Sequence, residues 1–204
     1  MIKKAELKHM SEMVKVTYLS DPNIFKYLFP VDKSKIMLIL QMLYRKPMTM
    51  FSKDYYYIYE NNNKVQGAIS FYSGTEKRTL EKNIMKFGKE IGDIAGKYTS
   101  FKMKFRKKIL KYIPTINDDE FYIQSLAVLP EYRGNRIASA LINFACSQAK
   151  SKNFHKVSLL VEKTNAHAIN VYTKIGFKIV ETSNIENKFK KYKINGFHKM
   201  VVKI

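Results

Sequence analysis

A short basic turn that contains one glycine is the part of the sequence best suited to bind an anion. Arg133, Gly134 and Arg136 lie between an apolar, strand-like stretch and residues with helical spacing. The first N–H groups of a helix lack partners within the helix and lie at the positive end of its dipole, so such an end binds phosphate groups. Gly134 lets the backbone bend toward a ligand, and the small Ala138 side chain leaves the approach open. The turn therefore predicts a phosphate site, long enough for a diphosphate.

Strand-like and helical stretches alternate around this turn and must position it. Apolar residues at 120–129 predict a buried strand, and helical spacing follows the turn as far as Lys150. A second strand and a second helix come next, and Gly176 is expected to cap that helix at its C-terminus. Two final strands are expected at 177–182 and 197–204. This alternation favours an α/β (α+β layered) architecture.

The N-terminal part predicts further elements of the same kinds. We expect a short strand at the start and then a helix that ends at the turn Ser20–Pro22. A second helix is expected at 33–45, followed by a hairpin of strands at 55–60 and 65–73.

The segment from Thr75 to Thr115 has a helical pattern and is very basic. Three glycines recur every four residues, at 88, 92 and 96. They would share one helix face, where they allow close packing but cost about 1 kcal/mol each. Four apolar residues recur at the same spacing: Phe101, Phe105, Ile109 and Ile113. A basic amphipathic helix can lie on a membrane or on RNA, but we favour a helix docked by its apolar stripe.

The bulk composition excludes some classes of protein. Cys146 is the only cysteine, so no intramolecular disulfide can form. The first ten residues lack the apolar core of a signal peptide, and no stretch reaches the ~18 apolar residues of a membrane span. We therefore expect a cytoplasmic protein. The four histidines show no metal-ligand spacing, so we expect no metal site.

The net charge of +20 has two explanations. It can serve an anionic partner such as a nucleic acid, a phosphate-bearing cofactor or an acidic surface. It can also reflect a solvated lysine coat, because charge runs usually mark solvated faces. We favour the second explanation. An acidic or RNA-associated partner that binds the segment from Thr75 to Thr115 is the alternative.

Two stretches together resemble a known family. LAVLPEYRGNRIASALI contains the basic turn, and NAHAINVYTKIGF follows the next strand. They are similar to the GNAT acyltransferase superfamily, the N-acetyltransferases that use acetyl-coenzyme A. The second stretch matches the family pattern at five positions: Asn165, Ala168, Tyr172, Gly176 and Phe177. The resemblance implies one GNAT domain over 1–204 with a central mixed β-sheet flanked by helices. The basic helical segment is then an insertion at about 75–117, between the third and fourth strands.

The sequence departs from the family pattern at one position in the turn. Arg136 stands where the family has a glycine. Because arginine is a good helix former, we expect Arg136 to begin the helix and its side chain to pair with a phosphate.

The resemblance also implies roles for individual residues. The backbone of Leu126, Ala127 and Val128 would bind the pantetheine arm, and an amide near Val128 would polarise the thioester carbonyl. Asn165 would hydrogen-bond the pantetheine, and Tyr172 would be the general acid, since a phenol is protonated at neutral pH. The diphosphate would be held by the loop formed by Arg133, Gly134, Asn135, Arg136, Ile137 and Ala138.

Glu120 is the candidate general base. It precedes Leu126 by six residues, so the two-residue alternation of a strand predicts both side chains on one face. Some lysine-directed members of the family carry their base at the matching position. Glu120 could take the amine proton directly or through water. With Asp118 and Asp119 it could equally form an exposed acidic turn, which would still attract a cationic amine.

These features predict an N-acetyltransferase that moves an acetyl group directly from acetyl-coenzyme A to a primary amine. The acceptor stays open among protein N-termini, lysines and small amines. The alternative is a degenerate acyltransferase scaffold that acts as a basic nucleic-acid-binding protein, because fold alone does not fix function.

Overall fold

The computed structural model of the chain describes residues 1–185 and 187–204. A seven-stranded sheet in the order β1-β2-β3-β4-β5-β7-β6 runs through it. The pairing of β4 with β5 is parallel, and the other pairings are antiparallel. The strands are β1 (Ile2–Lys4), β2 (Tyr56–Asn61), β3 (Lys64–Ser73), β4 (Phe121–Val128), β5 (Lys156–Glu162), β6 (Lys178–Thr182) and β7 (Phe197–Lys203). The expected α/β class with a mixed sheet is confirmed.

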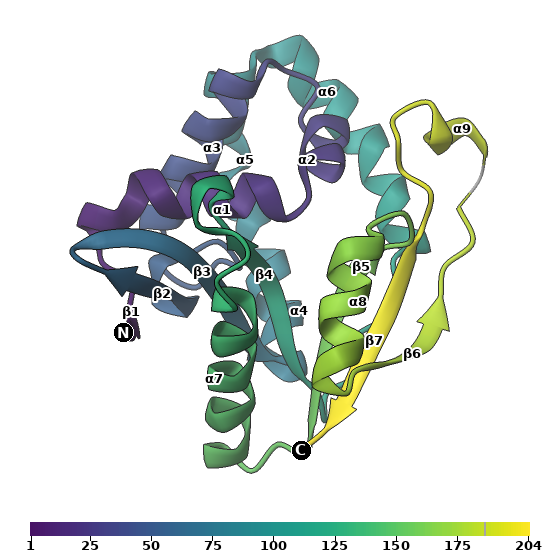
Figure 1. Cartoon of the computed structure of the whole chain (residues 1–204). Coiled ribbons are helices and arrows are strands. Elements are labelled where there is room, and N and C mark those ends of the chain that lie inside the picture. The colour runs from purple at the N-terminus through teal and green to yellow at the C-terminus, as the bar shows by residue number, and fades with distance from the viewer. Residues whose placement is uncertain (186) are drawn as a thin grey trace.

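Helices cover both faces of this sheet (Figure 1). The helices outside the β3–β4 connection are α1 (Met10–Ser20), α2 (Pro22–Leu28), α3 (Lys33–Arg45), α7 (Ile137–Ser151), α8 (Ala166–Ile175) and α9 (Asn187–Lys190). Short 3₁₀ turns occur at Leu7–His9, Lys53–Tyr55 and Pro130–Tyr132. Ile69 and Phe71 of β3 pack in a core that includes α7, whereas Ala68, on the other face, packs with Met13 of α1. α7 and α1 therefore hold the sheet from opposite sides.

The connection between β3 and β4 is helical. It contains α4 (Gly74–Ile84), a 3₁₀ turn (Met85–Phe87), α5 (Gly88–Ala95), α6 (Lys97–Arg106) and a 3₁₀ helix (Lys107–Tyr112). None of the helices in the described residues is long and apolar enough to cross a membrane.

Two expectations for this segment are wrong. Gly96 has a φ of 89° and ends α5, so the three glycines do not form a ridge on one continuous helix. Phe101 and Phe105 are 59% and 54% exposed, whereas Ile109 is fully buried. The change from α6 to a 3₁₀ helix at Lys107 alters the helical period, so the apolar stripe does not dock along its whole length.

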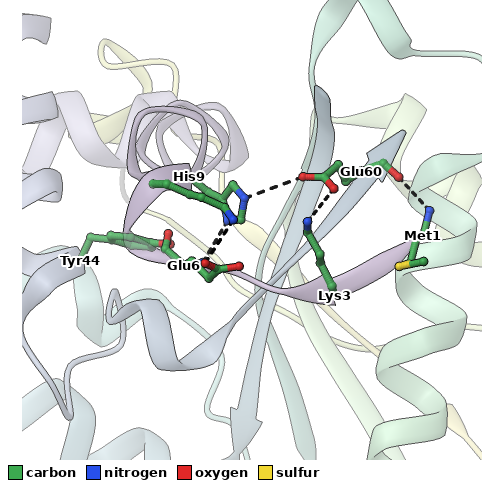
Figure 2. A network of polar contacts seen from close by, with 7 residues as sticks. Met1, Lys3, Glu6, His9, Tyr44 and Glu60 are labelled. Atoms are coloured by element: carbon green, nitrogen blue, oxygen red, sulfur yellow. Dashed lines mark hydrogen bonds and ion pairs between the residues drawn. The ribbon is translucent and has the colours of Figure 1, made fainter. Parts of the chain in front are cut away.

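The start of the chain is fastened to β2 by a polar network (Figure 2). Glu60 accepts from Lys3 Nζ through its carboxylate (2.6 Å) and from the Met1 amine through its carbonyl (2.8 Å). His9 Nε2 lies 3.8 Å from the same carboxylate, while His9 Nδ1 accepts from the Glu6 amide (3.0 Å). This network fixes β1 and the entry into α1.

α1 and α2 meet at a residue that belongs to neither helix. The turn Ser20–Pro22 ends α1 as expected, but α2 begins directly at Pro22, which the sequence reading did not anticipate. Asp21 caps α2, because its Oδ1 accepts from the Ile24 amide at 3.1 Å. The helix junction thereby holds the Asp21 carboxylate in one position.

Candidate active site

The strands β4 and β5 part halfway along their length. Their parallel pairing ends at Ile123, and the rest of β4 has no partner in β5. A bulge accounts for this change: Ser70 lies opposite Ser125 and Phe71 lies opposite Ile123, so Gln124 has no opposite residue in β3. Bulges bend a strand and end its pairing. The bulge at Gln124 therefore opens the sheet between β4 and β5.

A large cavity lies at this opening, with a volume of about 2520 Å³. Its walls come from β4, β5, the start of α7, α8, the α1–α2 junction and the helical connection. Asn135 and Glu120, two of the residues selected from the sequence, do not line it. The other selected residues do: Leu126, Ala127, Val128, Arg133, Gly134, Arg136, Ile137, Ala138, Asn165 and Tyr172.

The backbone of β4 directs hydrogen-bonding groups toward the opening. The amide of Leu129 donates to the carbonyl of Gln66 in the β3 segment (2.9 Å). Neighbouring residues in a strand turn their N–H and C=O groups to opposite sides. Ala127 therefore bonds toward β3, whereas Leu126 and Val128 present their amide groups to the gap. Two of the three residues expected to bind pantetheine, Leu126 and Val128, thus direct their backbone groups toward the gap.

The turn before α7 has the shape expected of an anion site. Gly134 has a φ of 85°, and α7 begins at Ile137 with no side chain capping its first amides. Those amides therefore stay available to a ligand. The side chain of Arg133 turns back to the strand, where its Nε donates to the Val128 carbonyl (3.3 Å).

Arg136 has a left-handed backbone, with φ 57° and ψ 15°. It precedes the first helical residue, so the expectation that Arg136 begins the helix is wrong and helix propensity does not apply to it. A left-handed conformation costs a non-glycine residue roughly 1–2 kcal/mol. This geometry explains why a glycine suits the position, and the arginine side chain lines the cavity instead.

Asn165 and Tyr172 lie on α8 at the opposite wall. Asn165 caps the helix, since its Oδ1 accepts from the Ala168 amide (3.2 Å). Its Nδ2 group is the part that can reach a ligand. Tyr172 packs against Phe177 with ring centroids 6.0 Å apart, and burial raises the pKa of its phenol to about 12. Tyr172 therefore stays protonated at neutral pH.

Glu120 lies outside the cavity in a buried ion pair. Its carboxylate is 2.8 Å from Lys199 Nζ, both side chains are 4% exposed, and Asn117 donates to both carboxylate oxygens. The prediction that Glu120 and Leu126 share a face is wrong, because the bulge at Gln124 adds a residue between them and reverses the alternation. The structure gives Glu120 a structural role, and we do not propose it as the base.

Asp21 and Glu162 are among the cavity carboxylates that the sequence analysis did not select. Burial raises the pKa of Asp21 to about 7; the hydrogen bond from the Ile24 amide opposes this shift, and the charge of Glu162 adds to it. Burial also raises the pKa of Glu162, opposed by the hydrogen bond from Asn23 and by the nearby backbone N–H of Asn195. In the sequence, Asp21 is explained by its position as a helix cap and Glu162 by its position at the end of a strand. Neither position indicates a catalytic role. In the described part of the chain no group of three or more His, Cys, Asp or Glu could hold a metal ion.

The model of the acetyltransferase (GNAT) family matches residues 34–177, which is more than half of the chain. The chain belongs to the GNAT acetyltransferase family. This finding confirms the family recognised from the two motifs, and the class of enzyme that the sequence predicts, an acyltransferase, is that of the family.

Known relatives and solved structures agree with this assignment. An N-alpha-acetyltransferase of Sulfurisphaera tokodaii is 34% identical over 91 residues, which are 44% of this chain and 53% of that protein. The chain spans about a quarter to a half of the length of the curated relatives it matches. An N-acetyltransferase from Staphylococcus aureus Mu50 superimposes with a TM-score of 0.70 at 23% identity, covering 99% of this chain and all of the other. PaiA N-acetyltransferase from Thermoplasma acidophilum, solved with coenzyme A, gives a TM-score of 0.53 at 14% identity over 100% and 98% of the two chains. The two solved structures show the shared fold.

Proposed function

We propose that this chain is an N-acetyltransferase that moves an acetyl group from acetyl-coenzyme A to a primary amine. The observation that carries the proposal is the unpaired part of β4, whose Leu126 and Val128 backbone groups face a cavity next to the anion-binding turn. An extended pantetheine arm can add to such an edge as a strand would. The coenzyme A bound to the Thermoplasma acidophilum PaiA enzyme, which shares the fold, supports the same cosubstrate here.

The anion-binding turn suits the diphosphate of the cosubstrate. The uncapped amides at the start of α7 and the positive end of its dipole favour a phosphate group. Arg133 and Arg136 add two fixed charges, and an arginine can hold a phosphate through two parallel hydrogen bonds. Asn165 binds the pantetheine through Nδ2 from the facing wall.

The cavity residues supply the proton and the oxyanion contact that the transfer needs. The nitrogen of a neutral amine forms a bond to the thioester carbon, and the Val128 N–H donates to the carbonyl oxygen as negative charge develops there. The carbon–sulfur bond then breaks, and Tyr172 gives its phenolic proton to the leaving sulfur. The proton that the nitrogen loses as the amide forms restores Tyr172.

A second candidate function rests on α6 and the 3₁₀ helix after it. Tyr98, Phe101 and Phe105 are exposed, and Lys102 Nζ lies 4.3 Å from the centre of the Tyr98 ring. Exposed aromatic rings among lysines suit the stacking of unpaired nucleic-acid bases. We propose RNA as the partner of this surface, with binding that weakens steeply as salt is raised.

Calorimetric titration with acetyl-coenzyme A tests the first proposal. We expect micromolar binding that weakens at least tenfold in Arg133→Ala, because a charge-assisted phosphate contact is worth about 1.5–3 kcal/mol. Arg45→Ala is the matched control, since Arg45 is an exposed arginine outside the cavity. A wild-type protein that does not bind acetyl-coenzyme A, or a control that loses as much affinity as Arg133→Ala, contradicts the proposal.

A further inference from the structure

The carboxylates that line the cavity differ in their partners. They are Asp21, Glu81, Asp93, Asp118 and Glu162. Three of them form ion pairs with a lysine or an arginine. Asp21 and Glu162 have no lysine or arginine within 4.0 Å among the residues that the structure describes. In a chain with a net charge of +20, two cavity carboxylates that influence each other and lack an ion pair among the described residues are unusual.

Asp21 and Glu162 are neighbours held from two sides of the cavity. Asn23, two residues after Asp21, donates through Nδ2 to Glu162 Oε2 at 3.3 Å. The same Nδ2 group is 3.2 Å from the carbonyl of Lys193. Asn23 therefore connects the start of α2 to the end of β5 and to the segment before β7. This contact places the end of β5 against the α1–α2 junction.

Glu162 has an oxygen that lacks a hydrogen-bond partner. Its Oε1 atom is shielded from solvent and makes no hydrogen bond of ordinary geometry with the described residues, whereas Oε2 is held by Asn23. The backbone N–H of Asn195 lies near enough to lower the pKa of the carboxyl group without forming such a bond. A buried polar atom without a partner costs about 1–3 kcal/mol, and buried polar groups almost always have partners. An unsatisfied carboxylate oxygen beside a second carboxylate is suited to a cationic donor.

No lysine or arginine in the described part of the chain contributes to the pKa shifts of Asp21 and Glu162. The charge of Glu162 acts on Asp21, and both Asp21 and Tyr172 act on Tyr122 of β4, whose pKa is raised above its usual range, chiefly by burial. Tyr122 is thus close enough to feel both Asp21 and Tyr172, the candidate acid. The pair therefore lies in the same part of the cavity as the expected reaction.

We propose that Asp21 and Glu162 form the acceptor subsite, which binds the ammonium group of a primary amine and takes up the proton that it must lose before attack. The step balances simply: one N–H bond of R–NH₃⁺ breaks, its proton moves to a carboxylate oxygen, and the lone pair left on nitrogen attacks the thioester carbon. The carboxylic acid then releases the proton to solvent. This inference rests on the proposed acetyl transfer and names the substrate class of that site.

The pair also determines which acceptors the site excludes. An ammonium group has three N–H donors, which are enough in number for Glu162 Oε1 and the Asp21 carboxylate. A hydroxyl group of the same size offers one donor and no charge, and a carboxylate is repelled. We expect selection for primary amines over alcohols of matching length, because unpaired buried groups discriminate strongly against analogues that lack the donor.

Direct binding of n-butylammonium to the protein loaded with coenzyme A tests the subsite without knowledge of the natural acceptor. We expect saturable binding at pH 8 by NMR titration, no binding of n-butanol or butyrate, and at least a tenfold weaker affinity in Asp21→Asn and Glu162→Gln. Glu181→Gln is the matched control, because Glu181 is an exposed carboxylate on β6 outside the cavity. Coenzyme A affinity should stay within twofold of the wild type in all three variants.

Acetyl transfer to butylamine supplies the kinetic arm of the same test. General-base catalysis contributes about 10²–10⁴-fold, so kcat/KM should fall by at least a hundredfold in Asp21→Asn. The acidic limb of its pH profile should also disappear from the region near pH 7.

The outcomes separate the two proposals. A wild type that binds coenzyme A but not butylammonium overturns the subsite and leaves the acetyl transfer standing. Variants with unchanged butylammonium affinity and an unchanged pH profile overturn it too. A wild type that fails to bind coenzyme A overturns the proposed function itself.

Discussion

Replacing Asp21 by asparagine should change the stability of the protein in a strongly pH-dependent way. Asparagine keeps the Oδ1 atom that accepts from the Ile24 amide, so the cap of α2 survives. It removes the ionisable group, whose pKa in the folded protein is raised from 3.8 to about 7. The variant therefore isolates the cost of holding a carboxylate at this position.

The magnitude follows from proton linkage. Between pH 4 and pH 7 the unfolded chain has released the Asp21 proton that the folded protein still holds, so wild-type stability falls as the pH rises through this window. A shift of roughly three pKa units at about 1.4 kcal/mol each gives roughly 4 kcal/mol by pH 8. The asparagine amide has a constant cost of about 1–3 kcal/mol if its NH₂ group is unpaired. We expect the variant to be more stable than the wild type at pH 8, and less stable at pH 4.

Urea unfolding at pH 4, 5, 6, 7 and 8 measures the difference. The free energy of unfolding of Asp21→Asn minus that of the wild type should rise by roughly 4 kcal/mol over this range, whatever the constant offset. In the Glu162→Gln background the rise should be smaller, because one source of repulsion is gone. A difference that stays flat from pH 4 to pH 8 would refute the reasoning, since Asp21 would then titrate as an ordinary exposed carboxylate.

Four other substitutions test the remaining parts of the structure. Arg136→Gly should stabilise the protein by about 1 kcal/mol in chemical denaturation, because glycine adopts the left-handed conformation freely, and should weaken acetyl-coenzyme A binding in calorimetry. Glu120→Gln should destabilise by about 3–5 kcal/mol, since it leaves Lys199 buried without its partner, while kcat of the folded enzyme is unchanged. Tyr172→Phe should lower kcat by about 10²-fold or more and leave coenzyme A affinity unaltered; an unchanged kcat would exclude it as the acid. His9 has a pKa lowered chiefly by burial, so the unfolded chain binds its proton first and wild-type stability should drop as the pH falls below about 6.5. His9→Gln should lack that component in thermal melts from pH 7 to pH 5.

The features that sequence could predict are those set by local pattern. A run of apolar residues, a glycine-containing turn and helical spacing predict β4, the turn at Gly134 and α7, because each depends on residues close in the chain. The face on which Glu120 lies could not be predicted, since one additional residue at Gln124 reverses the alternation and nothing in the apolar run marks it. The conformation of Arg136 was misjudged because helix propensity describes residues inside a helix, and Arg136 precedes it.

Asp21 and Glu162 show the other limit, because only the tertiary fold brings them together. They are far apart in the chain, and the contact that links them runs through Asn23. Each residue taken alone has an ordinary structural explanation, as a helix cap or as the last residue of a strand. Their place in one cavity with the unpaired stretch of β4 depends on the bulge, the α1–α2 junction and the separation of β4 from β5.

Three local costs in this molecule lie at one cavity. Arg136 holds a backbone conformation that suits glycine, and Asp21 and Glu162 form no ion pair with a lysine or arginine among the described residues; all three line the same cavity. Sequences depart from local rules mainly where function requires it, and strained or unsatisfied groups cluster at binding and catalytic sites. In the proposed reaction each of these residues has a ligand: Arg136 binds a phosphate group, and Asp21 and Glu162 bind the ammonium group of the acceptor. The ligands of the proposed transfer reaction would account for these three costs.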